Sequence, residues 1–232
     1  MIVGIMQPYL LPYIGYFQLV SAVDKFIVYD NIKYTKKGWI NRNRMLLNGK
    51  DVMFSLPLKK DSDFLNIVDR ELSVEFDRGK LLNQFKGAYL HSPYFSQTYP
   101  LLERIFSCKE KNLFRFIHFS LIETCLYLGI DTEIIISSDI SIDHKLKGEE
   151  KVLSICKALK ASSYINAIGG LSLYSKKNFD LNDINLSFIK TKHFEYKQLQ
   201  ATFVPSLSII DVLMFNPLDA VYKFLCSGFE LI

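Results

Sequence analysis

The first 17 residues constrain the fold more than any other part of the chain, because prolines separate an apolar strand from an apolar helix. Ile2 to Met6 is a short apolar run, which is typical of a strand buried on both faces in a parallel sheet. Pro8 and Pro12 fix φ and lack a backbone N–H, so neither suits a helix interior. The helix that follows is therefore predicted to begin with Pro12 in its first turn.

The start of this helix is a predicted ligand site. Tyr13, Gly15 and Tyr16 fall in its first turn, just past the strand. The free N–H groups and partial positive charge of a helix N-terminus favour a phosphate or a carboxylate. Parallel sheets also bind ligands at the carboxyl ends of their strands. The alternative is that these aromatic side chains only pack the N-terminal core.

A basic and aromatic segment follows at residues 33–44 and includes Lys37 and Trp39. If residues 40–45 are extended, Arg42 and Arg44 lie on one face. Two guanidinium forks on one face suit a phosphate or a carboxylate. The alternative is a solvated edge strand, where cations are common.

Short apolar strands alternate with helical patterns at both ends of the chain, which predicts an α/β fold with a mainly parallel sheet and flanking helices. Asn48-Gly49 predicts an antiparallel hairpin as the exception. We expect a single domain, residues 1–232, with a helical insert or cover around residues 78–129. The remaining predicted elements are extended segments at 25–29, 72–76, 132–136, 163–167, 185–190 and 192–196, and helices at 149–159, 171–175 and 207–215, the last capped by Ser206.

Three later features are candidate parts of a site. Gly169-Gly170 follows a predicted strand and permits close backbone approach to a ligand, although a plain tight turn is the alternative. Lys145 and Lys147 lie in a polar loop, where they either meet phosphates or are solvated. Asp211 is the polar residue of an apolar helix pattern, and a buried carboxylate needs a partner. Arg42 or Arg44 is the expected partner.

Composition narrows the class of protein. The net charge of +4 is too small to indicate a nucleic-acid binder by itself. The four cysteines, at 108, 125, 156 and 226, have no metal-type spacing, so we predict reduced thiols and no metal site. No basic segment precedes the N-terminal apolar run, and no apolar run approaches the roughly 18 residues of a membrane span, which predicts a cytoplasmic protein.

A long motif resembles the WbqC-like family. It comprises Gln7-Pro8-Tyr9-x-x-Pro12-Tyr13-x-Gly15-Tyr16-Phe17, Asp30-Asn31-x-x-Tyr34 and Gly38-Trp39-Ile40-Asn41-Arg42-Asn43-Arg44, with later matches at Tyr164-Ile165-Asn166, Gly169-Gly170, Tyr174, Phe203 and Leu207 to Asp211. The resemblance implies a role in O-antigen or other surface-polysaccharide biosynthesis. We take the following as ligand- or phosphate-binding, all but Lys37 being positions of this motif: Gln7, Pro8, Tyr9, Gly15, Lys37, Trp39, Asn41, Asn43, Gly169, Gly170 and Tyr174.

The segment Tyr13-x-Gly15-Tyr16 is also similar in layout to the His-x-Gly-His signature of nucleotidylyltransferase-like folds. In those enzymes the histidines bind and stabilise a nucleoside triphosphate, which implies ATP, with Mg²⁺, as a cofactor here. Tyrosine donates a hydrogen bond but is neutral at pH 7. Phosphate binding is therefore compatible with the tyrosines, whereas the family's charge stabilisation does not carry over.

The leading hypothesis is a group-transfer enzyme that moves an activated acyl, aminoacyl or nucleotidyl group to an amino sugar or a nucleotide sugar. Its candidate catalytic residues are Tyr13, Tyr16, Arg42, Arg44, His193 and Asp211. The alternative is a non-catalytic protein that binds a nucleotide sugar or an aminoacylated carrier. A nucleic-acid binder is the third hypothesis, because Tyr34 and Trp39 could stack on the bases of a single-stranded nucleic acid. A transferase that uses an aminoacyl-tRNA donor would need such a surface.

Overall fold

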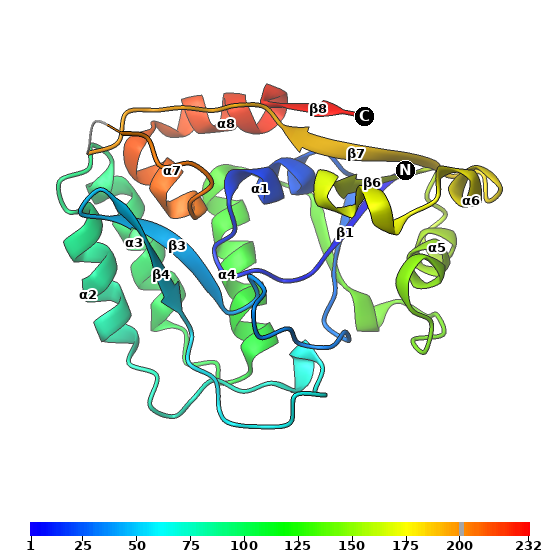
Figure 1. Cartoon of the computed structure of the whole chain (residues 1–232), viewed down its shortest axis with the longest axis horizontal. Helices are drawn as coiled ribbons and strands as arrows, with labels where there is room; N and C mark the ends of the chain where they lie inside the picture. The colour runs from blue at the N-terminus through cyan, green and yellow to red at the C-terminus, as the bar shows by residue number, and fades with distance from the viewer. Residues whose placement is uncertain (200–201) are drawn as a thin grey trace.

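A computed structural model describes residues 1–199 and 202–232, and its centre is a six-stranded sheet in the order β5-β2-β1-β6-β7-β8 (Figure 1). Neighbouring strands are parallel except β7 and β8. The strands are β1 (Ile2–Met6), β2 (Lys25–Val28), β5 (Glu133–Ile136), β6 (Ser163–Ala167), β7 (Asn185–Thr191) and β8 (Phe229–Leu231). A separate antiparallel hairpin joins β3 (Arg42–Leu47) to β4 (Lys50–Ser55), with positive φ at both Asn48 and Gly49. The predicted fold class is confirmed.

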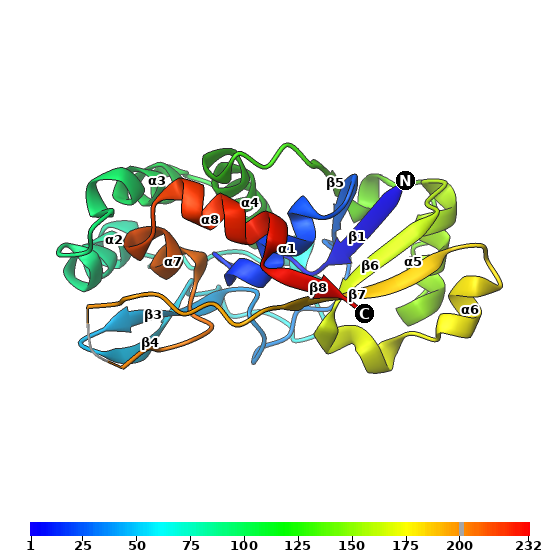
Figure 2. The same ribbon diagram turned by 90° about the horizontal axis from the view of Figure 1, so that it is seen from above.

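Helices cover both faces of the parallel sheet, which explains why the central strand β1 is apolar along its whole length. On one face, α1 (Ile14–Ser21) and α8 (Leu218–Ser227) pack over Phe26, Val28 and Ile165. On the other face, α5 (Gly148–Ala158) and α6 (Lys176–Asp180) pack over Val3 and Ile5. Figure 2 shows the two groups of helices on opposite sides of the strands.

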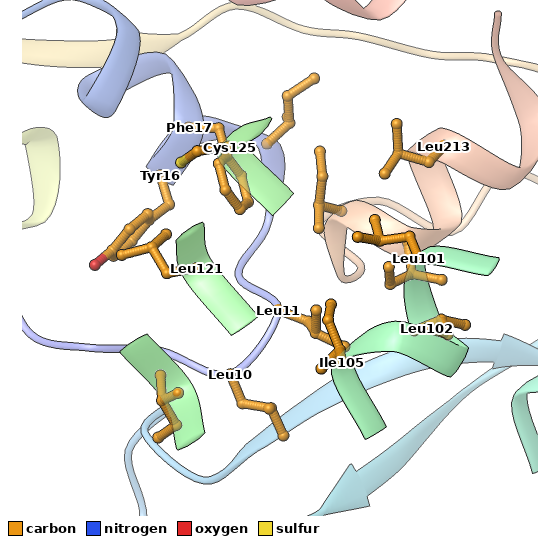
Figure 3. Close-up of a cluster of buried hydrophobic side chains, with 14 of the residues drawn as sticks. Leu10, Leu11, Tyr16, Phe17, Leu101, Leu102, Ile105, Leu121, Cys125 and Leu213 are labelled. Atoms are coloured by element: carbon orange, nitrogen blue, oxygen red, sulfur yellow. The ribbon is translucent and has the colours of Figure 1, made fainter. Parts of the chain in front are cut away.

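The segment predicted as an insert or cover forms α2 (Arg78–Tyr89), α3 (Phe95–Ser107) and α4 (Leu113–Leu128). Gly129 ends α4 in the left-handed conformation, as expected of a glycine C-cap. These helices share a core with the sheet, since Ile105 of α3 and Leu121 of α4 lie in one buried cluster with Phe26 of β2. Figure 3 shows part of this cluster around Leu11.

Several predicted boundaries differ from the structure. Residues 72–76 form no strand; Leu72 makes only an isolated bridge, and the backbone turns where Phe76 N–H donates to the carbonyl of Ser73. Residues 192–196 lie beyond the end of β7. The predicted cap Ser206 is wrong, because α7 (Ile209–Phe215) is capped by Ser208, whose hydroxyl accepts from the N–H of Ile210 at 3.3 Å.

The start of α1 also differs. The helix begins at Ile14, and Tyr13 is its extended N-cap residue, so Pro12 precedes the first turn. The carbonyl of Pro12 accepts from the N–H of Ile209 at 2.9 Å, which ties this connection to α7. Leu11 has φ of 42°, an uncommon conformation for an apolar residue. Short 3-10 turns at Ile67–Asp69, Ser137–Asp139 and Ile168–Leu173 complete the described elements.

The strand order reverses between β1 and β6. The chain runs from β1 outward to β2 and β5, crosses back through α5 to β6, and continues to β7. Loops at the carboxyl ends of β1 and β6 therefore leave in opposite directions. A crevice at such a switch point is where open α/β sheets bind their ligands.

Candidate functional site

A cavity of about 340 Å³ occupies the switch point. The structure brings together there a set of predicted ligand residues from the carboxyl ends of β1 and β6. They are Gln7, Tyr9, Gly169, Gly170 and Tyr174. The sequence prediction that these two segments form walls of one cavity thus agrees with the geometry.

The two glycines have different surroundings. A Cβ on Gly170 would lie 2.7 Å from the side-chain amide nitrogen of Asn166, which lines the same cavity. A Cβ on Gly169 would meet no atom within 4 Å. Gly170 therefore allows Asn166 to pack against the turn, and only Gly169 leaves open space.

A larger cavity of about 780 Å³ adjoins the first and shares Tyr29, Ile32 and Tyr174 with it. We call the two cavities together the switch-point cleft. The larger one is strongly basic, and its cationic and imidazole side chains are Lys33, Lys145, Lys147, Lys151 and His144. The loop of Lys145 and Lys147, for which a solvated role was the alternative, therefore lines a cavity.

Lys151 is the most unusual of these groups. Its side chain is buried, with the residue only 4% exposed, and its ammonium donates to Oδ1 of Asn31 at 2.7 Å and lies 5.3 Å from the ring centre of Tyr29. Within the described part of the chain it forms no ion pair with a carboxylate. Burial lowers the pKa of Lys151, and the nearby charge of Asp30 acts in the opposite direction.

Asn31 connects this lysine to His144. The amide oxygen of Asn31 accepts from Lys151 and from the hydroxyl of Ser137 at 3.1 Å, so its nitrogen faces Nδ1 of His144 at 2.9 Å. An ammonium only donates, which fixes the orientation of the amide. Nδ1 of His144 must then accept, and the proton of the neutral ring lies on Nε2. His144 is thereby held as a hydrogen-bond donor.

A further cavity of about 310 Å³ shares Tyr9 with the switch-point cleft. We call it the aromatic pocket; it is lined by Tyr9, Pro12, Tyr13, Trp39, Asn43, Arg44 and Ser206. Arg44 pairs with Asp51 at 2.8 Å and donates to the carbonyl of Ser206 at 3.1 Å. Predicted residues Tyr13, Trp39, Asn43 and Arg44 thus gather in one pocket.

Other predicted residues of the basic segment bind the protein itself. Arg42 donates to the carbonyls of Gly38 at 3.0 Å and Lys37 at 2.5 Å. Asn41 donates to the carbonyl of Leu56 and accepts from the hydroxyl of Tyr34. Arg42 and Arg44 therefore have separate protein partners, and the aromatic pocket contains only the second of them.

The tyrosine motif is divided between surface and core. Tyr16 is buried and donates its hydroxyl to the carbonyl of Gln7 at 2.9 Å. Pro8, the residue after Gln7, is also buried. Gly15 has no room for a Cβ, because the ring of Tyr13 and the hydroxyl of Thr191 occupy that space. The glycine therefore accommodates Tyr13, which is exposed.

The expected pairing of Asp211 with an arginine is wrong. Its carboxylate is fully buried and accepts from the hydroxyls of Tyr89 at 3.0 Å and Tyr196 at 2.6 Å and from the amide of Gln198 at 2.8 Å. Burial raises the pKa of Asp211, and these hydrogen bonds act in the opposite direction. His193 forms no hydrogen bond with this network; it is exposed, lies 3.3 Å from Glu195, and lines a cavity of about 360 Å³ together with Tyr13 and Tyr196.

Sequence reasoning did not select Lys151, His144 or Asn31 as site residues. Lys151 has the appearance of a solvated helix position, and only its burial in the fold distinguishes it. Among residues 1–199 and 202–232 there is no group of three or more His, Cys, Asp or Glu that could hold a metal ion. Over the same residues, no helix has the length and apolar character needed to cross a membrane.

Comparisons with known proteins place this geometry in a family. An uncharacterized protein of Mycobacterium tuberculosis, Rv1507c, is 28% identical over 218 residues, which cover 92% of this chain and 93% of that protein. The model of the WbqC-like protein family matches residues 7–223, a range that contains the aromatic pocket and all of the lining of the switch-point cleft except Ile5 and Met6. The chain therefore belongs to the WbqC-like protein family.

Proposed function

We propose that the chain is a group-transfer enzyme of surface-polysaccharide precursor biosynthesis, and that the switch-point cleft binds the phosphates of a nucleotide or nucleotide sugar. The group moved to an amino sugar or nucleotide sugar would be acyl, aminoacyl or nucleotidyl. Membership of the WbqC-like family suggests the pathway. The observation that carries the choice of ligand is the buried ammonium of Lys151, which has no carboxylate partner among the described residues.

A buried charge is costly unless it is paired and hydrogen-bonded. Lys151 donates one hydrogen bond to Asn31 and lines a cavity that Lys33, Lys145 and Lys147 also line. The carboxylate of Asp30 acts on Lys151 without forming an ion pair with it. An anionic ligand would supply a direct counter-charge, and an ammonium acts on phosphate as a compact point charge. Four lysines around about 780 Å³ suit a polyphosphate better than a single carboxylate.

The chemistry of such a site is positioning and electrostatic stabilisation. His144, held with its proton on Nε2, would donate a hydrogen bond from that N–H to a phosphate oxygen and so stabilise its charge. ATP is the activator that we propose, because its phosphates fit the same lysines. With no cluster of acidic or imidazole ligands in the described residues, Mg²⁺ would be held by the phosphates themselves.

Isothermal titration calorimetry with ATP, UDP and UDP-N-acetylglucosamine tests the proposal. We expect at least one of them to bind the wild-type protein, and Lys151→Met to weaken that binding by about tenfold or more. Lys157→Met is the matched control, because Lys157 is an exposed residue of the same helix. Equal affinity in the wild type and both variants, or no binding at millimolar concentration, would contradict the proposal.

A non-catalytic nucleotide-sugar- or carrier-binding protein is the second candidate. The burial of Tyr16 supports it, because that position of the motif is not open to a triphosphate. Binding without turnover of any nucleotide would favour this alternative. The nucleic-acid hypothesis has less support, since Tyr34, one of the two aromatic residues expected to stack, is buried and bonded to Asn41.

A further inference from the structure

We propose that the aromatic pocket binds the pyranose ring of a sugar, separately from the phosphate site. Tyr13 and Trp39 are 37% and 41% exposed, and among the described residues Phe64 and Tyr222 are the only other aromatic side chains exposed to this degree. Both line the aromatic pocket. Aromatic rings offer a flat apolar surface, and the hydroxyl of a tyrosine adds a polar group at its edge. A pyranose has the matching form, with C–H groups on its faces and hydroxyls around its rim.

The charge of the pocket favours a neutral ligand. Arg44 is its only cation, and Asp51 already pairs with that guanidinium at 2.8 Å. The carbonyl of Ser206 accepts a second N–H at 3.1 Å. Arg44 lies 5.8 Å from the ring centre of Trp39, where it orients the indole. The arginine is therefore placed to hold the ring and to hydrogen-bond a hydroxyl, and its charge is compensated.

The hydrogen-bonding groups distinguish a sugar from a nucleobase. Reading the edge of a base requires a free amide or an equivalent pair of donor and acceptor. The only amide of the pocket is Asn43, which donates to the carbonyls of Leu10 and Leu11 at 3.0 and 2.8 Å and accepts from the N–H of Arg44. The other polar side-chain groups are the hydroxyls of Tyr13 and Ser206 and that of Tyr9, which donates to Oε1 of Gln7 at 3.4 Å and can still accept from a sugar hydroxyl.

The walls are rigid. The connection after β1 is fixed to β3 by Asn43 and to α7 by the hydroxyl of Ser208, which donates to the carbonyl of Leu11 at 2.8 Å. Two non-glycine residues with positive φ lie here, Leu11 in that connection and Ser206 at the pocket. Such strained positions cluster at ligand sites. The connection that leads to Tyr13 is thus anchored before a ligand arrives.

This inference deepens the proposed function, because the aromatic pocket meets the switch-point cleft at Tyr9. A phosphate in the cleft and a sugar ring in the pocket would lie on either side of that tyrosine. The aromatic pocket would then take the sugar that receives or carries the transferred group.

Trp39 is the only tryptophan of the chain, so its fluorescence reports on this pocket alone. We would titrate N-acetylglucosamine and, in a parallel series, uridine and adenosine. The expected result is a saturable change of emission with the sugar, an affinity about tenfold weaker in Tyr13→Ala, and little change in Tyr222→Ala, an exposed tyrosine of α8. Circular dichroism verifies that each variant is folded.

The Trp39 variants lack the fluorescent residue, so their sugar affinity is measured by isothermal titration calorimetry. Trp39→Ala should abolish sugar binding and Trp39→Phe should retain most of it. Lys151→Met separates the two sites, because sugar binding should persist in that variant even if nucleotide binding is lost or never occurs. A response to a nucleoside but not to the sugar, no response to any probe, or an unchanged sugar affinity in Tyr13→Ala and Trp39→Ala would overturn the inference.

Discussion

Asp211 offers a stringent test of how the core beside the aromatic pocket is stabilised. Its carboxylate is fully buried and accepts three hydrogen bonds from neutral donors, two tyrosine hydroxyls and one amide. Asp211→Ala would leave the buried donors Tyr89, Tyr196 and Gln198 without this acceptor. An unsatisfied buried donor costs about 1 to 3 kcal/mol. Allowing for local relaxation, we expect a loss of about 3 to 6 kcal/mol in the free energy of unfolding.

Asp211→Asn keeps the shape and one acceptor oxygen, and the tyrosine hydroxyls can rotate to accept from its amide. We expect it to cost clearly less, about 1 to 2 kcal/mol. The comparison separates the loss of hydrogen-bond partners from the loss of charge. Urea denaturation followed by far-ultraviolet circular dichroism gives both free energies.

The raised pKa of Asp211 also predicts how the free energy of unfolding changes with pH. Because burial raises the pKa of Asp211, the native state retains this proton to a higher pH than the unfolded chain does. Between the two pKa values the native state binds more protons, so this residue makes the free energy of unfolding fall as pH rises. As pH rises above about 4, the free energy of unfolding of the wild type should therefore fall relative to that of Asp211→Asn. Equal losses in Ala and Asn variants, or a difference that is independent of pH, would refute the reasoning.

Four further predictions follow from named contacts. Lys151→Met should leave the unfolding free energy without ligand within about 1 kcal/mol of wild type or raise it, because an apolar side chain replaces a buried charge; a large loss in urea denaturation would show that the lysine is structural. Nitrogen-15 NMR should find neutral His144 protonated on Nε2, and a proton on Nδ1 would contradict the bond to Asn31. Gly170→Ala should weaken nucleotide binding in calorimetry, because the new Cβ displaces the Asn166 side chain, and unchanged affinity would show that this wall is dispensable. In the native protein a thiol reagent should label exposed Cys226 quickly but not Cys125, whose pKa burial raises to about 12, whereas equal labelling rates would argue against that burial.

Local sequence signals predicted the parts of the fold that depend on neighbouring residues. The apolar run of β1, the Asn48-Gly49 turn and the glycine after α4 each specify their conformation locally, and the structure contains all three. The predicted strand at 72–76 failed because Leu72 and Phe76 pack from a turn that leaves Val74 exposed, and such a turn has no distinct short-range signature.

The site divides in the same way. Gln7 and Gly169 were predictable as neighbours, because the carboxyl ends of parallel strands meet at one edge of a sheet. The role of Lys151 was not predictable. A lysine next to the apolar face of a helix gives the same sequence pattern whether its ammonium is buried or solvated. The need of Asp211 for a partner was predictable from its apolar surroundings. The donors themselves were not, since Tyr89 lies far away in the chain.

The central claim is that phosphates bind against Lys151 in the switch-point cleft, and a crystal structure with bound UDP-N-acetylglucosamine or ATP tests it most directly. We expect a phosphate oxygen about 2.7 to 3.0 Å from the ammonium of Lys151, with Lys145 or Lys147 on the same phosphates. A nucleotide whose phosphates lie instead against Arg44 and Tyr13, with Lys151 still bonded only to Asn31, would contradict it.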